Sequence, residues 1–292
     1  MDVRVLRYFI VIAQEENISH AAAILHVSQP ALSRQIADLE TSLGTKLFIR
    51  GKRHLQLTQD GYYLLERAQE IIGLVDKTTY NLQKQDVISG TLDIGAGEST
   101  SLSGVMETIK QLIHKYPDIH VNFHSGDSET IQAELNSGIL EFGIIMGHKQ
   151  LDNYNKLELP ERNHWGVVMR ADEQLATRKR IQPSDLIGRP LLSSRQATQR
   201  KIFQTWSNGL FDQFNIIGTY NLFFNAGLLI KTGACMALTY ENLADTSENS
   251  DLVFRPLEPE LTDPNTLIWS KNRNLPEVDK LFLETLQKNI DI

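Results

Sequence analysis

A short polar segment begins an apolar-periodic stretch and could make hydrogen bonds with nucleic acid: Ser28-Gln29-Pro30-Ala31-Leu32-Ser33-Arg34. The amide of Gln29 can form two hydrogen bonds with an adenine, and Arg34 can pair with a guanine or a phosphate. The two serines can donate to phosphates, and the proline or the alanine can touch a thymine methyl. These residue types, so spaced, favour contact with the base edges of a DNA duplex.

Two helices joined by a short turn must position this segment. Leu6, Phe9, Ile10 and Ala13 are spaced as on one helical face and predict a first helix that ends near Glu16-Asn17. Ser19 is a suitable N-cap for a second helix over 21–25. Val27-Ser28 forms the turn, Pro30 suits the first turn of a third helix, and Gly44 ends that helix. The pattern predicts a helix-turn-helix, the alternative being a structural helical hairpin with a polar surface.

Basic residues follow the third helix. Two short extended segments, 46–50 and 54–57, flank Gly51-Lys52-Arg53, and the stretch from Thr41 to Gln59 holds four cations and no acid. The net charge of −7 argues weakly against nucleic acid, yet residues 1–60 carry seven Lys/Arg against six Asp/Glu. A local basic patch can neutralise phosphates because salt makes charge a short-range matter. The alternative is a solvated charge run.

A long helix is predicted from Thr58, a good N-cap, to about Gln85. Apolar or small residues recur along it at alternating spacings of four and three: Leu64, Ala68, Ile71, Val75, Thr78 and Leu82. Such a seam is typical of a helix that pairs with a second copy of itself. The alternative is a helix that lies on its own domain.

Strands and helices alternate after the boundary at Ile88-Ser89-Gly90, which predicts a helix-covered, mainly parallel sheet in two lobes. We expect strands over 91–95, 120–124, 142–146, 165–169, 190–193, 216–219, 234–238 and 266–270. We expect helices over 102–115, 129–138, 198–208, 222–232 and 278–290.

Residues 1–67 resemble the DNA-binding domain of the LysR-type transcriptional regulators. The matching elements are Leu6-Arg7-Tyr8-Phe9, Ala21-Ala22, Ser28-Gln29-Pro30-Ala31-Leu32-Ser33, Ile36, Leu39-Glu40, Leu43-Gly44, Leu47-Phe48-Ile49-Arg50, Leu57-Thr58 and Gly61. The resemblance implies an α/β multidomain protein, with a winged helix-turn-helix over 1–58, a linker (dimerisation) helix over 59–88 and an effector-binding domain over 89–292. Arg50, Lys52 and Arg53 would lie on the wing and contact phosphates or a minor groove.

The same resemblance implies partners. The chain would form a homodimer through the long helix and often a homotetramer through the effector-binding domain. It would bind an inverted-repeat promoter site in double-stranded DNA, with half-sites about one helical turn apart. RNA polymerase is a further expected partner.

The effector-binding domain would resemble a type 2 periplasmic-binding protein, with a small-molecule effector held between lobe I (91–160 with 267–292) and lobe II (161–266). In lobe I we expect the effector to meet Glu98, Ser99, Thr100 and Ser101 at a helix N-terminus that suits an anion, with Asp127 and Met146. In lobe II we expect Ser194, Arg195, Asn221 and Phe223, with Arg195 placed to hold an anionic group. Two alternatives stay open: Ser99 or Ser101 only caps the helix, and Arg195 is only a surface residue. Because Glu98 and Asp127 are acids, a plain carboxylate effector is less expected.

Other functional classes have weaker signals. The eight histidines show no metal-ligand spacing, and neither a Gly-x-Ser-x-Gly motif nor a phosphate-binding Gly-Lys-Ser/Thr motif is present, so we expect no enzyme, cofactor or metal. A transport binding protein would need an export signal, which the N-terminus does not resemble, and an architectural DNA binder would be basic overall. Cys235 lies in an apolar stretch and is predicted to be a buried structural thiol rather than a redox sensor. We expect a cytoplasmic protein.

Overall fold

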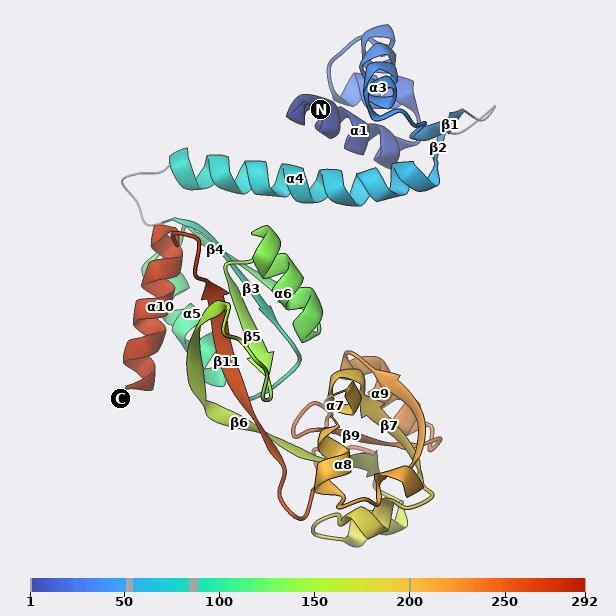
Figure 1. The fold of residues 1–292 in the computed structure, drawn as a ribbon, viewed down its shortest axis with the longest axis vertical. Coiled ribbons are helices and arrows are strands. Elements are labelled where there is room, and N and C mark those ends of the chain that lie inside the picture. The colour runs from blue at the N-terminus through green and yellow to red at the C-terminus, as the bar shows by residue number, and fades with distance from the viewer. Residues whose placement is uncertain (1, 51–54, 84–88, 200, 292) are drawn as a thin grey trace. The chain divides into compact units, whose positions relative to one another are not determined.

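The computed structural model describes residues 2–50, 55–83, 89–199 and 201–291 (Figure 1). The chain divides into two units, Met1–Gln85 and Asp86–Ile292. Within the described residues, no helix is both long and apolar enough to cross a membrane.

The first unit consists of four helices and a hairpin. The helices are α1 (Val3–Glu15), α2 (Ile18–Ile24), α3 (Gln29–Leu43) and α4 (Gln59–Gln83), and the antiparallel hairpin joins β1 (Phe48–Arg50) to β2 (Leu55–Leu57). One core forms where α1, α2 and α3 meet, and it includes the fully buried Phe9, Ile12 and Leu32. Ala21 and Ala22 are buried on α2, and their small side chains let the helices approach closely.

The ends of α2 and α3 are set by local caps. The predicted Ser19 cap is wrong, because the side chain of Asn17 accepts the N–H groups of Ser19 (2.9 Å) and His20 (3.1 Å), so α2 begins earlier, at Ile18. Ser28 is the N-cap of α3, and its Oγ accepts the N–H of Ala31. Gly44 ends α3 in the left-handed conformation (φ 70°), as the sequence predicted.

The carboxylate of Glu40 joins α3 to the base of the hairpin. It is buried, and it accepts the backbone N–H groups of Leu47 (2.9 Å) and Phe48 (3.3 Å) and the ammonium of Lys46 (2.7 Å). Burial alone would raise the pKa of Glu40, but these hydrogen bonds outweigh it and hold the pKa below its usual range.

Helix α4 begins against the same hairpin base. The Thr58 hydroxyl accepts the N–H of Gly61 (3.0 Å) and donates to the carbonyl of Lys46 (2.6 Å). A Cβ at Gly61 would lie 2.2 Å from the carbonyl oxygen of Leu47, so this crossing requires glycine.

The predicted pairing seam of α4 is wrong for its first two members. Leu64 and Ala68 are buried in the core of their own unit, together with Ile72. Ile71 and Leu74 of α4 stay exposed, as do Tyr62 and Tyr63 near its start. Leu82 belongs to α4, but its side chain lies outside the described residues.

The second unit contains a nine-stranded sheet in the described residues. The strands are β3 (Gly90–Ala96), β4 (Ile119–Ser125), β5 (Phe142–Met146), β6 (Tyr154–Arg170), β7 (Pro190–Ser194), β8 (Asn215–Tyr220), β9 (Met236–Tyr240), β10 (Leu252–Pro256) and β11 (Thr262–Ser270). The order is β4-β3-β5-β11-β6-β9-β7-β8, and β10 pairs with β6. Pairs β3–β4, β3–β5, β7–β8 and β7–β9 are parallel, whereas β6 and β11 pair antiparallel with all their neighbours. The expected mainly parallel sheet is therefore wrong, and the sheet is mixed.

Two long strands connect the two halves of this unit (Figure 1). The first part of β6 pairs with β11, and its last residues pair with β9 and β10. In lobe I, α5 (Ser103–Lys115) and α10 (Glu277–Ile290) share one core, and α6 (Ser128–Ser137) packs in another. In lobe II, α9 (Phe223–Lys231) packs in one core and α8 (Ile202–Trp206) in another.

Two further expectations fail in lobe II. The single helix expected over 198–208 is instead the pair α7 (Arg195–Gln199) and α8, and Lys201 between them has a positive φ of 56°, which no continuous helix allows. Strand β10 was not predicted, and it covers the end of β6. The remaining helices are three short 3-10 turns: η1 (Gln174–Thr177), η2 (Pro183–Leu186) and η3 (Phe211–Gln213).

Candidate nucleic-acid interface and ligand cleft

The first turn of α3 presents the predicted polar residues to solvent. Ser28, Gln29, Pro30 and Arg34 are exposed, and Ser33 is half-buried. The amide nitrogen of Gln29 donates to the hydroxyl of Ser33 (2.9 Å), which orients the amide along the helix surface. The opposite face of α3 carries the buried Leu32, Ile36 and Leu39. A helix anchored in this way offers its polar first turn to a partner without unfolding.

The hairpin follows in the chain, and its cations are only partly described. Arg50 ends β1, where it is the register partner of Leu55. The side chain of Arg50 and the whole of Lys52 and Arg53 lie outside the described residues.

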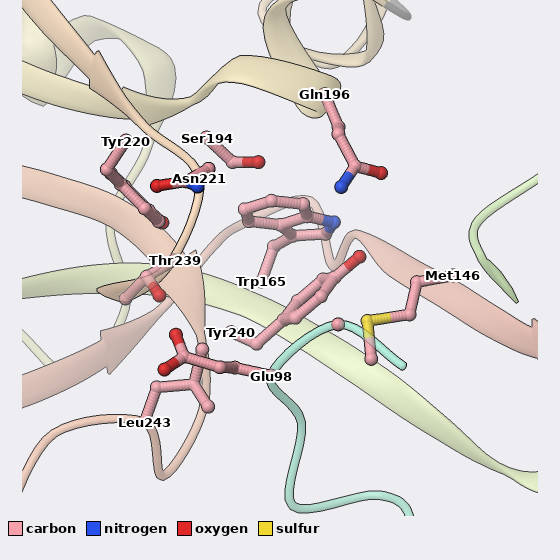
Figure 2. Close-up of a pocket in the computed structure, with 11 residues that line it drawn as sticks. Glu98, Met146, Trp165, Ser194, Gln196, Tyr220, Asn221, Thr239, Tyr240 and Leu243 are labelled. Atoms are coloured by element: carbon pink, nitrogen blue, oxygen red, sulfur yellow. The ribbon is translucent and has the colours of Figure 1, made fainter. Parts of the chain in front are cut away.

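A cavity of about 40 Å³ lies in the second unit between the ends of strands from both lobes (Figure 2). Four of the predicted ligand residues line it: Glu98, Met146, Ser194 and Asn221. The other lining residues are Gly97, Trp165, Gln196, Tyr220, Thr239, Tyr240 and Leu243.

The three hydroxyl residues after Glu98 are not among the lining residues. Ser99 contacts the side-chain oxygen of Asn163 and accepts the N–H of Ser101 (2.9 Å). Thr100 donates to the carbonyl of Glu241 (3.4 Å), and the hydroxyl of Ser101 donates to the carbonyl of Arg162 (2.9 Å). The expected helix N-terminus at these residues is wrong. Helix α5 starts only at Ser103, with an N-cap at Leu102 that uses no side chain, so neither serine caps it.

Glu98 in lobe I reaches an element of lobe II. Its carboxylate accepts the backbone N–H of Phe223, the first residue of α9. The N-cap of α9 is Leu222, whose side chain makes no capping hydrogen bond. Phe223 itself, expected to contact the ligand, is buried and does not line the cavity. Glu98 therefore supplies the negative group that the positive end of α9 attracts.

A second contact between the lobes is an ion pair. Asp127 caps α6 by accepting the N–H of Thr130 (3.0 Å) and its hydroxyl (2.9 Å), and it also pairs with the guanidinium of Arg195. The hydrogen bond from the Thr130 backbone, with those from the Thr130 and Arg195 side chains, lowers the pKa of Asp127 below its usual range. Arg195 was expected to hold an anionic ligand, but in this structure a carboxylate of the protein occupies it, and neither residue lines the cavity.

Aromatic residues form a wall of the cavity that the sequence reading missed. The rings of Trp165 and Tyr240 lie 4.2 Å apart between centroids, at 51° to one another. The indole N–H of Trp165 (3.0 Å) and the hydroxyl of Tyr240 (2.7 Å) both donate to the buried carboxylate of Asp263. In Figure 2 the amide of Gln196 and the sulfur of Met146 point toward this ring pair. The available signal was the polar Thr239-Tyr240 pair at the end of a strand.

The described part of the chain gives little support to a redox cysteine or a metal site. Cys235 is buried, and burial raises the pKa of its thiol, which suits a structural cysteine. The described residues contain no group of three or more His, Cys, Asp or Glu side chains placed to hold a metal ion.

Family models match both units of the chain. The model for the bacterial regulatory helix-turn-helix protein of the lysR family matches residues 3–62, and the model for the LysR substrate binding domain matches residues 85–291. The Hca operon transcriptional activator HcaR of Escherichia coli is 27% identical over 296 residues, which cover 99% of this chain and 98% of that protein.

Other relatives match over a shorter length. The HTH-type transcriptional regulator BsdA of Bacillus subtilis is 37% identical over 49% of this chain and 50% of its own. The hydrogen peroxide-inducible genes activator of Pectobacterium carotovorum is 30% identical over 66% of this chain and 64% of its own. The chain thus spans about half to two thirds of the length of these relatives.

Solved structures share the fold. Full-length CbnR, crystallised in complex with its target DNA, superposes with a TM-score of 0.74 at 20% sequence identity, over 99% of this chain and 100% of that one. Since the two family models between them match nearly the whole sequence, this chain belongs to the LysR family of transcriptional regulators.

Proposed function

We propose that this chain is a sequence-specific DNA-binding transcription regulator that responds to a small molecule held between the two lobes of its C-terminal domain. Residues 1–58 form the winged helix-turn-helix, 59–88 the linker helix and 89–292 the effector-binding domain, with lobe I at 91–160 and 267–292 and lobe II at 161–266. The observation that carries this proposal is the exposed polar first turn of α3, held on a helix whose other face is buried.

The DNA contacts fall into two groups. Gln29 and Arg34 read base edges in the major groove, and Pro30 meets a thymine methyl. Ser28 and Ser33 bind phosphates and fix the position of α3 on the duplex. Arg50, Lys52 and Arg53 contact the backbone or a minor groove beside the recognition helix.

The effector contacts come from both lobes. Glu98, Met146, Ser194 and Asn221 meet the effector directly, because these predicted residues line the cavity. Ser99, Thr100 and Ser101 hold the loop that carries Glu98, through the hydrogen bonds described above. Asp127, Arg195 and the N–H of Phe223 respond to the effector by making or breaking the contacts between the lobes. The cleft binds its ligand without catalysing a reaction on it.

Self-association has two candidate surfaces. The exposed face of α4, with Ile71 and Leu74, pairs two chains into a homodimer. Two-fold symmetry then matches an inverted-repeat promoter site in double-stranded DNA.

The second surface lies on the effector-binding domain and pairs dimers into a tetramer. Strands β4 and β8 are the two edges of the sheet, and the exposed Phe123 and Ile217 lie on them. Phe224 and Leu228 of α9 are 73% and 52% exposed, more than an isolated domain is expected to leave in water. In the tetramer, lobe I of one copy covers lobe II of another. RNA polymerase is the partner that contacts the assembled regulator at the promoter.

Selection of bound fragments from genomic DNA by the purified full-length chain tests this proposal. We expect recovered fragments to share an inverted repeat, and metabolite mixtures to change their enrichment. The double variant Gln29→Ala with Arg34→Ala should lose this enrichment, whereas Lys288→Ala, which removes an exposed cation from the second unit, should keep it. A folded wild-type protein that enriches no fragment over bulk competitor, with or without metabolites, would overturn the proposal.

A further inference from the structure

The charges around the cavity restrict what it can hold. Among its lining residues Glu98 is the one charged side chain, and none of them is Lys, Arg or His. Asp263 lies behind Trp165 and Tyr240 and accepts a hydrogen bond from each. Arg195, which lies in the chain between the lining residues Ser194 and Gln196, is paired with Asp127. An anion entering this cavity would meet a carboxylate and no free cation on its lining residues.

A helix N-terminus beside the cavity that could bind an anion is already occupied. The N-terminus of α9 would attract a carboxylate, but the carboxylate of Glu98 already accepts the N–H of Phe223 there. A carboxylate effector would have to displace Glu98 and leave it close by, in a confined site with like charge. Such like-charge contacts are unfavourable where water is scarce.

The same groups are well suited to a cation. An ionised carboxylate accepts several hydrogen bonds, so Glu98 can receive an ammonium while it keeps the N–H of Phe223. Trp165 and Tyr240 line the cavity while their polar N–H and O–H groups are bound to Asp263. Ring faces are negative, and a cation within about 6 Å of one is attracted to it. Ser194 and Asn221 add further oxygen acceptors.

We propose that the effector is a small organic ammonium ion, whose charged group binds Glu98 and whose apolar part lies on Trp165 and Tyr240. This inference rests on the proposed function, since it takes the cavity to be the effector site. The ammonium group then lies between Glu98 and the ring pair, all of which line the cavity.

Probes that differ only in charge test the inference. The full-length chain is titrated calorimetrically with butylammonium, butyrate and 1-butanol, and with benzylammonium, benzoate and benzyl alcohol. We expect each ammonium ion to bind at least tenfold more tightly than its matched carboxylate and its matched alcohol.

Variants of Glu98 connect this preference to one side chain. Glu98→Gln keeps an oxygen for the N–H of Phe223 but removes the charge, and it should weaken ammonium binding at least tenfold. Glu98→Asp should keep the preference for ammonium. Glu284→Gln, which neutralises an exposed acid of α10 outside the lining of the cavity, should change nothing.

DNA binding, measured by fluorescence anisotropy on the same samples, separates this inference from the proposed function. A chain that binds its DNA site but binds carboxylates as well as ammonium ions, or binds none of the ammonium probes, overturns the ligand class alone. Equal ammonium affinity in wild type and Glu98→Gln overturns the role of Glu98. A chain that binds no DNA site overturns the proposed function itself.

Discussion

Arg34 illustrates what a single side chain contributes in this protein. It is exposed on α3, and it makes no ion pair with another described residue. If its guanidinium pairs with a guanine, Arg34→Ala should weaken binding of the selected site by about 1–3 kcal/mol, or roughly 10- to 100-fold. Binding to random DNA should weaken much less. Anisotropy titrations with both duplexes at one salt concentration measure the two losses.

Equal losses on the selected and random duplexes would mean that Arg34 contacts only phosphate. Lys288→Ala is the matched control, because it removes one exposed positive charge far along the chain from α3. That variant should leave both affinities within error.

Glu40 makes the stability of the first unit depend on pH. Its pKa is lowered in the folded chain, so its contribution is fully present above the unfolded value of about 4.3 and is lost as the pH falls through the folded value. Glu40→Gln should destabilise the fold by about 1–3 kcal/mol at pH 7, because charge-assisted hydrogen bonds are lost. Denaturant titrations from pH 7 to pH 3 should show the gap between wild type and variant closing only below about pH 4.5. A gap that stays constant down to pH 3 would contradict this assignment.

At the scale of the residue, the sequence could predict positions that depend only on the local pattern. Glu98, Met146, Ser194 and Asn221 were expected at the cleft because they lie near the ends of predicted elements, and they line the cavity. Trp165 and Tyr240 were missed because an aromatic residue in an apolar strand is usually a core residue. The pairing of Asp127 with Arg195 joins residues 68 positions apart, and no local pattern reports such a contact.

Helix α4 has a buried apolar face and an exposed one, and we expect the first to stabilise the fold and the second to form the dimer. Leu64→Ala should destabilise the first unit by about 2–5 kcal/mol, because it opens a cavity in a buried core. Ile71→Asp with Leu74→Asp should instead leave the fold intact and dissociate the dimer, because both side chains are exposed. Circular dichroism melts report the first effect, and sedimentation equilibrium reports the second. A dimer that survives the double variant would remove this face from the interface.

The basic hairpin can be tested through salt. Each phosphate contact contributes about −0.9 to the slope of log K against log salt. Lys52→Ala with Arg53→Ala should therefore make the slope shallower by about 1.8, if both residues contact phosphates. Anisotropy titrations between about 50 and 200 mM salt measure it. An unchanged slope would place neither residue on the DNA.

Limits set by near neighbours were partly predicted, and those that depend on distant pairing were not. The end of α3 follows from Gly44, as expected, but the start of α2 is set by Asn17 rather than by the predicted Ser19. The strand expected over 165–169 is only the last part of β6, because residues 154–164 become a strand by pairing with β11, about a hundred positions later. The break at Lys201 depends on the packing of α8 in the core of lobe II, which local periodicity does not reveal.

Assembly into a tetramer depends on surfaces of the whole molecule, and the exposed face of α9 is the one tested first. Phe224→Glu with Leu228→Glu should reduce the tetramer to a dimer, because it places two charges on an exposed apolar face of α9 without touching the buried Phe223, Ala226 and Ile230. Light scattering of the full-length chain measures the mass. Asn225→Glu, on the same helix at an exposed polar position, is the control and should keep the wild-type mass. An unchanged mass in the double variant would show that α9 is not in the interface.

The place of β11 in the sheet affects the order in which the chain can fold during its synthesis. It lies between β5 and β6 and pairs with both, so these two strands are not joined in one sheet until residues 262–270 exist. The ribosome makes β7, β8, β9 and β10 before that point, and all four can pair with one another or with the end of β6. A nascent chain that pauses before Thr262 therefore holds a nearly complete lobe II and a lobe I that still lacks β11 and α10.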